Sequence, residues 1–269
     1  SNRWGTFPSI SAGWRISKES FMESVLKPLA ISNLKFKFSL GQQGNQASAG
    51  LAGNFANIST LGSSTDRPYG NYDLNGENST SQQGYTVIRR GNPNLRWETT
   101  SHYNFGADLG FFNDQLGIIF DYYIKNTEDI LFPKPQLSAV GEGYAPIENI
   151  GDLNTKGLDL SISFNKTNAD KDFTFSTQFQ FSTAKNEVTY IDSMVGLKGL
   201  EGEVYIDAYG PSRIATGKPL GVFFGYETDG LFQSESEATT APLQNGGKGN
   251  HEGRIKYKDQ NSDGVIDDK

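Results

Sequence analysis

The chain has 269 residues, of which 35% are hydrophobic and 12% aromatic, and its formal net charge is −7. Neither this negative charge nor the scattered Lys and Arg residues fits a nucleic-acid binder, whose surface carries a basic patch. The chain has no cysteine for a disulfide framework or a thiolate metal site, and it lacks the run of about 20 apolar residues that a membrane-spanning helix requires.

Six segments alternate apolar and polar residues, which predicts β-strands whose two faces meet different surroundings. In chain order they cover residues 7–16, 34–43, 97–111, 116–125, 157–165 and 173–184. Within each alternating part, every Lys, Arg, Asp and Glu falls on the polar face. The pattern is clearest in the last segment, where Phe173, Phe175, Phe179 and Phe181 share one face and small polar residues share the other. The fold class is therefore all-β, and the apolar faces could meet either lipid or a soluble core.

The connection between the first two predicted strands, residues 17–33, contains a short amphipathic stretch. Ser17 is a candidate N-cap, Glu19 follows within the first turn, and Phe21, Val25 and Leu29 are among the residues of an apolar face near Pro28. Two interpretations fit: a short capped helix at the periplasmic rim of a membrane barrel, or a packed surface helix of a soluble protein.

The other connections alternate in length. Residues 112–115 and 166–172 form short links, whereas residues 44–96, 126–156 and 185–269 form long ones. Outer-membrane barrels have short turns on one side and long extracellular loops on the other, and each strand needs only about 10 residues with every second one apolar. This rhythm favours an antiparallel transmembrane β-barrel over a soluble β-sandwich.

Several motifs, in a fixed order, resemble the barrel of SusC/RagA-type TonB-dependent outer-membrane transporters. One of them is Asn92-Pro93-Asn94-Leu95-Arg96-Trp97-Glu98-Thr99-Thr100. The other matching segments are residues 2–16, 34–46, 121–123, 149–151 with 156–157, 225–232 and 255–267. The resemblance covers nearly the whole chain, and the ordered set is far more specific than any single member.

The resemblance implies that residues 1–269 are about six strands plus long extracellular loops of one 22-stranded barrel domain. Such transporters lie in the outer membrane of Gram-negative bacteria of the Bacteroidetes type. They import oligosaccharides or peptides with energy delivered through TonB, together with a SusD-like surface lipoprotein. The plug domain and the TonB-contacting segment are absent, so we expect a piece of a longer polypeptide. Because open sheet edges are not tolerated in hydrocarbon, we expect that this piece neither transports nor folds stably by itself.

Residues 259–267 match the start of an EF-hand calcium loop, with oxygen-bearing side chains at alternating positions and a glycine at the sixth. The bidentate acid of the twelfth position would fall just beyond Lys269, and no flanking helix is predicted. A glycine-containing Asx turn held by its own side chains fits the same residues, so both interpretations stay open. The candidate calcium ligands are Asp259, Asn261, Asp263, the carbonyl group of Val265, and Asp267.

Other candidate chemistry is sparse. His102 lies on a predicted lumen face, where a hydrogen-bonded spectator is expected rather than a catalyst, and no spacing of carboxylates singles out an acid/base pair, so we predict no enzyme. Lumen charges are expected to pair with one another, contact the plug or be hydrated; they are Arg15, Lys35, Lys37, Asp108, Asp121 and Asp159. An interfacial aromatic girdle is predicted for Trp4, Trp14, Trp97, Tyr122 and Tyr123. The loop aromatics that are better ligand candidates are Tyr69, Tyr72, Tyr85, Tyr144 and Tyr205.

The leading hypothesis is therefore the barrel portion of an outer-membrane importer. One alternative is a secreted, calcium-stabilised β-sandwich that recognises glycans through residues 259–267 and exposed tyrosines. Another is a barrel of the same build that acts in adhesion or secretion.

Overall fold

The computed structural model describes residues 4–46, 56–62, 72–73, 81–82, 84–134, 144–167, 174–192, 203–205 and 212–267. The chain forms two compact units: unit 1 is Ser1–Ala208 with Arg213–Val222, and unit 2 is Tyr209–Ser212 with Phe223–Lys269. In the described part of the chain, no helix has both the length and the apolar character needed to cross a membrane.

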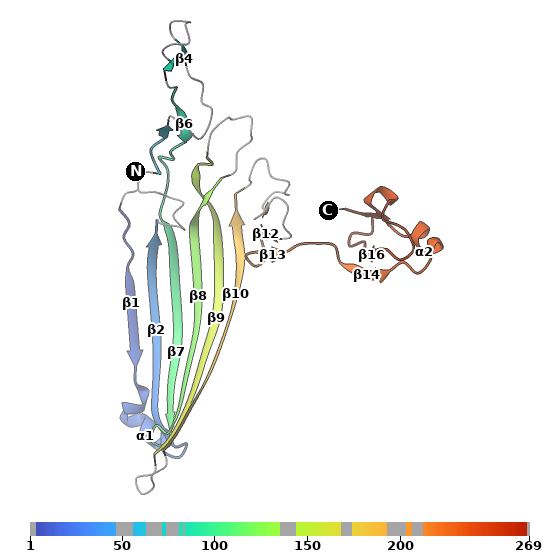
Figure 1. The fold of residues 1–269 in the computed structure, drawn as a ribbon. Helices are drawn as coiled ribbons and strands as arrows, with labels where there is room; N and C mark the ends of the chain where they lie inside the picture. The colour runs from blue at the N-terminus through green and yellow to red at the C-terminus, as the bar shows by residue number, and fades with distance from the viewer. Residues whose placement is uncertain are drawn as a thin grey trace. The chain divides into compact units, whose positions relative to one another are not determined.

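Unit 1 is built on one six-stranded antiparallel sheet (Figure 1). Its strands are β1 (Ser9–Trp14), β2 (Ile31–Asn45), β7 (Glu98–Phe111), β8 (Leu116–Pro133), β9 (Ile147–Thr167) and β10 (Thr174–Ile191), and they lie side by side in this order. Each long strand therefore pairs with the next one along the chain, which is an up-and-down meander. All six predicted strands exist.

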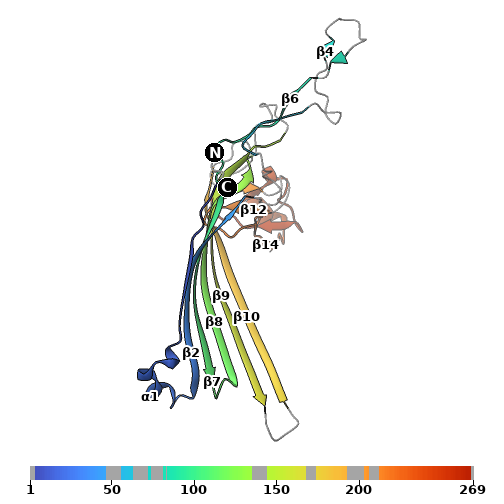
Figure 2. The same cartoon turned by 90° about the vertical axis from the view of Figure 1, so that its left-hand side faces the viewer.

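Short connections gather at one end of this sheet, where both views place α1 and the β7–β8 turn (Figure 2). In that turn Phe112, Asn113 and Asp114 all have positive φ angles of 54°, 57° and 63°. The turn is held by Ser32, whose hydroxyl donates to Asp114 Oδ1 at 2.7 Å and accepts from the Asp114 amide at 3.0 Å. The predicted turn at residues 112–115 is thus confirmed, whereas most of the predicted turn at residues 166–172 lies outside the described residues.

The strands extend well beyond the predicted segments at the other end of the sheet. β8 continues to Pro133, β9 begins at Ile147 and β10 continues to Ile191, so parts of the predicted loops 126–156 and 185–269 are strand. In these extensions polar residues occupy both faces, so the alternation disappears from the sequence although the backbone ladder continues. Conversely, β1 is shorter than residues 7–16.

Short strands also occur inside the predicted loops. Within residues 44–96, β3 (Thr60–Gly62) pairs with β6 (Thr86–Arg89), and β4 (Tyr72–Asp73) pairs with β5 (Ser81–Gln82). Beyond β10, a three-stranded sheet contains β11 (Glu203–Tyr205), β12 (Ser212–Ala215) and β13 (Val222–Phe223).

The helical stretch between β1 and β2 is a series of single turns: η1 (Ile16–Lys18), η2 (Ser20–Met22) and α1 (Glu23–Leu26). The predicted cap at Ser17 is wrong, because Ser17 lies inside η1 and the extended residue Glu19 interrupts the run. The N-cap of α1 is Met22, which makes no side-chain cap. Only Leu26 of α1 is buried, while the apolar side chains of Phe21, Val25 and Leu29 are exposed.

The buried apolar clusters of unit 1 lie in the strand extensions. Leu131 packs on Ile147 in one cluster, and Val188 packs on Ile191 in another, which Ile214 of β12 helps to cover. Among the described residues, the part of the main sheet between these extensions and the short turns contributes no member to either buried pair.

Unit 2 folds a segment that was predicted as loop. It contains β14 (Thr228–Leu231), α2 (Glu235–Thr240), β15 (Leu243–Gln244), η5 (Asn245–Gly247), β16 (Ile255–Tyr257) and β17 (Val265–Ile266). β14 pairs antiparallel with β16, and β15 pairs parallel with β17. The N-terminus of α2 is capped by Ser234, whose hydroxyl accepts from the Glu237 amide at 3.2 Å, while Glu237 accepts from the Gln233 amide at 2.8 Å. Phe232 and Ala238 are each 1% exposed and form the small interior.

Candidate functional site

The strand register gathers the apolar residues on one face of the main sheet. One row across all six strands consists of Trp14, Phe36, Ala107, Phe120, Leu160 and Phe181. The described parts of unit 1 leave much of this face uncovered: Phe105, Phe179 and Phe181, which all lie on it, are 50%, 58% and 49% exposed. An exposed apolar surface of this extent marks contact with a membrane or another protein.

The charged residues of this face lie at the two ends of the apolar rows. On β9, Leu158, Leu160, Ile162 and Phe164 occupy the face between Lys156 and Lys166. Ten residues at about 3.4 Å each span about 34 Å along the strand, and a tilt of about 40° reduces this to about 26 Å across the membrane. Outer-membrane barrels have an apolar band about 25 Å tall. We call the apolar face between the rows of Lys156 and Lys166 the belt.

The opposite face of the sheet is polar and carries a three-strand ion cluster. Lys37 Nζ of β2 lies 2.7 Å from Asp108 Oδ1 of β7 and 3.4 Å from Asp121 Oδ2 of β8. Asn104 Nδ2 donates to Asp121 Oδ1 at 3.3 Å. Gly106 makes this possible, because a Cβ atom there would collide with both Lys37 Cε and Asp121 Oδ1. Three of the predicted lumen charges therefore pair with one another.

The remaining predicted lumen residues stay outside this cluster. Asp159 lies opposite Asp121 in the register, without an ion pair to any described residue. Arg15 follows β1. The Lys35 side chain lies over Gly13, where an added Cβ atom would be 3.2 Å from Lys35 Cε. His102 packs edge-on against Tyr123 with ring centroids 5.9 Å apart, and its Nε2 atom has no hydrogen-bond partner among the described residues.

The predicted aromatic girdle needs one correction. Tyr122 lies on the apolar face, opposite Phe105 and Leu158. Its neighbour Tyr123 points to the polar face, where it contacts His102 and lies 4.9 Å from Lys125 Nζ, because successive strand residues alternate. Of the predicted ligand aromatics, Tyr85 and Tyr144 are exposed, with Arg89 over the Tyr144 ring at 5.6 Å. Tyr69 and the side chains of Tyr72 and Tyr205 lie outside the described residues.

A polar network of Arg96, Asp129 and Asn149, which sequence reasoning missed, holds the strand extensions together. Asp129 adopts a φ of 59° at a bulge in β8, and its carboxylate lies 2.6 Å from Arg96 Nη2. Asn149 binds the backbone on both sides: Nδ2 donates to the Arg96 and Asp129 carbonyl oxygens at 3.0 and 2.8 Å, and Oδ1 accepts from the Arg96 amide at 2.9 Å. The available signal was the pair of motifs around Arg96 and Asn149, which the structure brings together.

The predicted calcium ligands occupy a tight loop with internal hydrogen bonds. Asp259 accepts from the Ser262 and Gly264 amides at 2.7 and 2.8 Å, and Asp263 Oδ1 accepts from the Val265 amide at 2.9 Å. Gly264 has a φ of 83°, which explains the glycine. No three acidic or histidine side chains of the described residues form a metal-holding group. Calcium binding by Asp259, Asn261, Asp263, Val265 and Asp267 stays a prediction.

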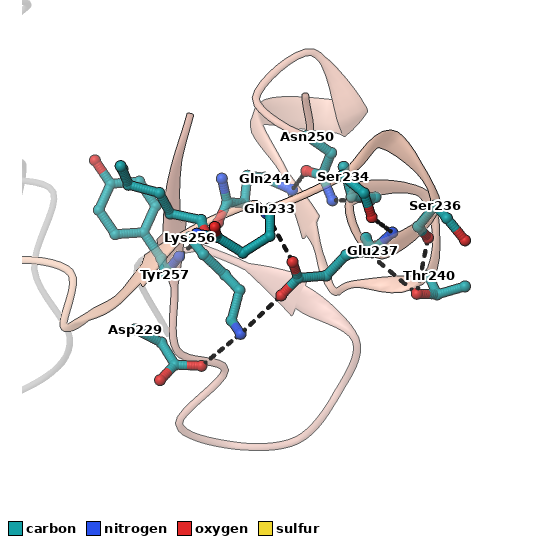
Figure 3. A network of polar contacts seen from close by, with 12 residues as sticks. Asp229, Gln233, Ser234, Ser236, Glu237, Thr240, Gln244, Asn250, Lys256 and Tyr257 are labelled. Atoms are coloured by element: carbon teal, nitrogen blue, oxygen red, sulfur yellow. Dashed lines mark hydrogen bonds and ion pairs between the residues drawn. The ribbon is translucent and has the colours of Figure 1, made fainter. Parts of the chain in front are cut away.

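Unit 2 is tied together by a central lysine (Figure 3). Lys256 Nζ lies 2.9 Å from Asp229 Oδ2 and 3.2 Å from Glu237 Oε1. The Lys256 ammonium group lowers the pKa of Asp229, and the Gln233 amide together with Lys256 lowers the pKa of Glu237. These bonds link β14, the start of α2 and β16.

A cleft of about 490 Å³ lies within unit 2, and its lining includes Tyr226, Tyr257, Gln244 and Arg254. The two tyrosine rings have centroids 5.2 Å apart. Gln244 serves the fold, because it accepts from the Tyr257 amide at 2.6 Å and donates to the Ile255 carbonyl at 3.0 Å. Rings beside a guanidinium group suit polar organic ligands, and neither tyrosine was among the predicted ligand residues.

Comparison with known proteins agrees with this geometry. A family model described as "TonB dependent receptor-like, beta-barrel" matches residues 1–263. TonB-dependent receptor P3 of Formosa agariphila is 33% identical over 241 residues, covering 86% of this chain and 21% of that protein. TonB-dependent receptor SusC of Bacteroides thetaiotaomicron is 27% identical over 276 residues, covering 99% and 24%. The RagAB peptide importer in its open-open state has a TM-score of 0.65 and 25% identity, covering 84% of this chain and 22% of the solved one. The chain spans between a fifth and a quarter of the length of these proteins.

Proposed function

The chain belongs to the TonB-dependent receptor-like β-barrel family, and from this premise we propose that it forms part of the wall of a nutrient importer in the outer membrane. The belt carries the proposal: six strands present a continuous apolar face whose charged residues lie at its two ends, at a spacing that fits the apolar band of an outer-membrane barrel. Family membership also favours this function over a secreted β-sandwich.

In this function the polar face lines the lumen or contacts a plug. Lys37 is shared by Asp108 and Asp121, so this cluster of one ammonium group and two carboxylates keeps a formal net charge of −1, while Asn104 and His102 add polar groups on the same face. In the described part of the chain, β1 and β10 are the edge strands of this sheet, and further strands of a longer polypeptide would close it. We infer a 22-stranded closed barrel with a plug, TonB as the energy source and a SusD-like lipoprotein as partner.

The cargo that we propose is an oligosaccharide or a peptide. Support comes from the solved relative named as a peptide importer and from the cleft of unit 2, where Tyr226 and Tyr257 offer ring faces beside Arg254. Both cargo classes stack on aromatic rings, so the cleft fits either. Calcium at residues 259–267 remains part of the proposal, since the loop has the spacing of an EF-hand.

Uptake by cells tests the proposal. The full-length receptor gene is deleted and restored, and growth is measured on single glycans and on defined peptides as sole nutrient. We expect one cargo class to require both the receptor and TonB, and Tyr226→Ala to weaken its uptake. Normal growth of the deletion strain on every glycan and peptide would contradict the function.

A further inference from the structure

Two lysines lie side by side on the outward, apolar face of the sheet. Lys156 of β9 is directly opposite Lys185 of β10, and both are exposed. Residues opposite each other on antiparallel strands have Cβ atoms about 4.5–5.5 Å apart, so like charges there are destabilising. Neither lysine forms an ion pair with a described residue, although Glu187 lies two positions along the same face.

The pair marks the end of the belt that carries the long connections. Their row continues into Ile124 and Tyr103, and the row below it contains Leu158, Tyr122 and Phe105. Short turns are periplasmic and long loops extracellular in outer-membrane barrels, so this end reaches the headgroups of the outer leaflet. Tyrosine is typical of that level.

Beyond the lysines the outward face becomes polar and hollow. Asn154 Nδ2 donates to Asn126 Oδ1 at 2.5 Å in the next row. A hollow of about 370 Å³ is lined by Lys156, both asparagines, Glu128, Asp152 and Glu187, among others. It offers a cation at its edge and hydrogen-bond acceptors inside, which suits a headgroup that carries both phosphate and hydroxyl groups.

We propose that Lys156 and Lys185 bind the phosphate group of a hydroxyl-rich lipid headgroup in the outer leaflet. The phosphate compensates the two opposed ammonium groups, while the hollow above accepts the headgroup hydroxyls. This inference rests on the proposed function, because it requires the belt to lie in a membrane. Lys166 provides a matched control: it lies on the same strand and face, at the opposite end of the belt.

The test uses the full-length receptor in detergent as wild type, as K156Q/K185Q, as K156R/K185R and as K166Q. Heat-modifiable migration in gels first shows that each is a folded barrel. Binding is then measured for diphosphoryl lipid A and for its dephosphorylated form, with inorganic phosphate as a competitor. A surface lysine contributes about fivefold to the binding of anionic lipid, so we expect K156Q/K185Q to lose about thirtyfold. K156R/K185R and K166Q should stay within about twofold of wild type.

Equal binding by K156Q/K185Q and wild type would overturn the site, as would equal binding of the dephosphorylated lipid. Displacement by an excess of inorganic phosphate would reassign the lysines to free anions and overturn the lipid assignment. A wild-type receptor without the folded-barrel signature would overturn the proposed function itself, whereas a folded barrel with unchanged binding overturns only the lipid site.

Discussion

Replacing Leu160 by lysine would place one charge near the middle of the belt. Leu160 lies four residues below Lys156 and six above Lys166 on β9, which puts it about 10 Å beneath the outer rim after correction for strand tilt. A lysine at the centre of a barrel's lipid face costs about 2–4 kcal/mol. We expect Leu160→Lys to lower the free energy of unfolding by this amount, measured by denaturant titration of the full-length receptor in vesicles.

Two companion variants separate lipid from a packed protein core. Leu160→Trp should cost less than about 1 kcal/mol against fluid lipid, whereas overpacking a protein core costs about 1–3 kcal/mol. Ser161→Lys carries the same charge on the opposite face, where Ser161 accepts a hydrogen bond from Gln178 at 3.1 Å, so its cost should stay at about 1 kcal/mol. Equal costs for the two lysine variants, or a large cost for tryptophan, would refute the reasoning.

Three further predictions concern the polar groups. Gly106→Ala should displace Lys37 from Asp121, because a Cβ atom at position 106 would occupy the space in which the two side chains meet. The ion pairs are partly exposed, so the free energy of unfolding should fall by about 1 kcal/mol. Unchanged stability would contradict the meeting of these two side chains over Gly106. The pKa values of Asp229 and Glu237 are lowered in the folded protein, so both carboxylates stabilise unit 2 above their unfolded pKa of about 4, and this stabilisation is lost as the pH falls through their folded pKa values. The protection factors of the α2 amides, which are corrected for the intrinsic exchange rate at each pH, should therefore fall at acid pH, and less so in Lys256→Met; an equal fall in both would oppose this assignment. Calorimetry should detect calcium binding that Asp263→Ala abolishes, and unchanged heats would exclude the loop as its site.

The sequence sufficed to locate the six long strands and both of their faces. A period of two specifies which residues share a face, and the observed register then aligns Phe36, Phe120, Leu160 and Phe181 without exception. Strand ends were harder to predict, because alternation vanishes where β8, β9 and β10 leave the belt and each face carries both polar and apolar residues. The elements of unit 2 were missed because each is only two to six residues long, which is too short to show a hydrophobic period.

Contacts between distant residues could not be derived from local pattern. The Lys37 cluster depends on Gly106 in the intervening strand β7, and the polar network of Arg96, Asp129 and Asn149 depends on the bulge in β8. The motifs that contain Arg96 and Asn149 identify the family, but only the structure explains them: they fasten a long loop to the strand extensions. Tyr123 was predicted in the aromatic girdle together with Tyr122, although successive strand residues point to opposite faces and only Tyr122 lies on the apolar one.

The most direct test of the central claim is the accessibility of spin labels along β9. Single cysteines at positions 157–165 of the full-length receptor, after replacement of any other cysteine, are labelled and measured in vesicles with oxygen and with a water-soluble nickel chelate. We predict that labels at Leu158, Leu160, Ile162 and Phe164 respond mainly to oxygen, and that labels at Asp159, Ser161 and Ser163 respond mainly to nickel. Labels at the four apolar positions that are shielded from oxygen, or that respond mainly to nickel, would contradict a belt in contact with lipid.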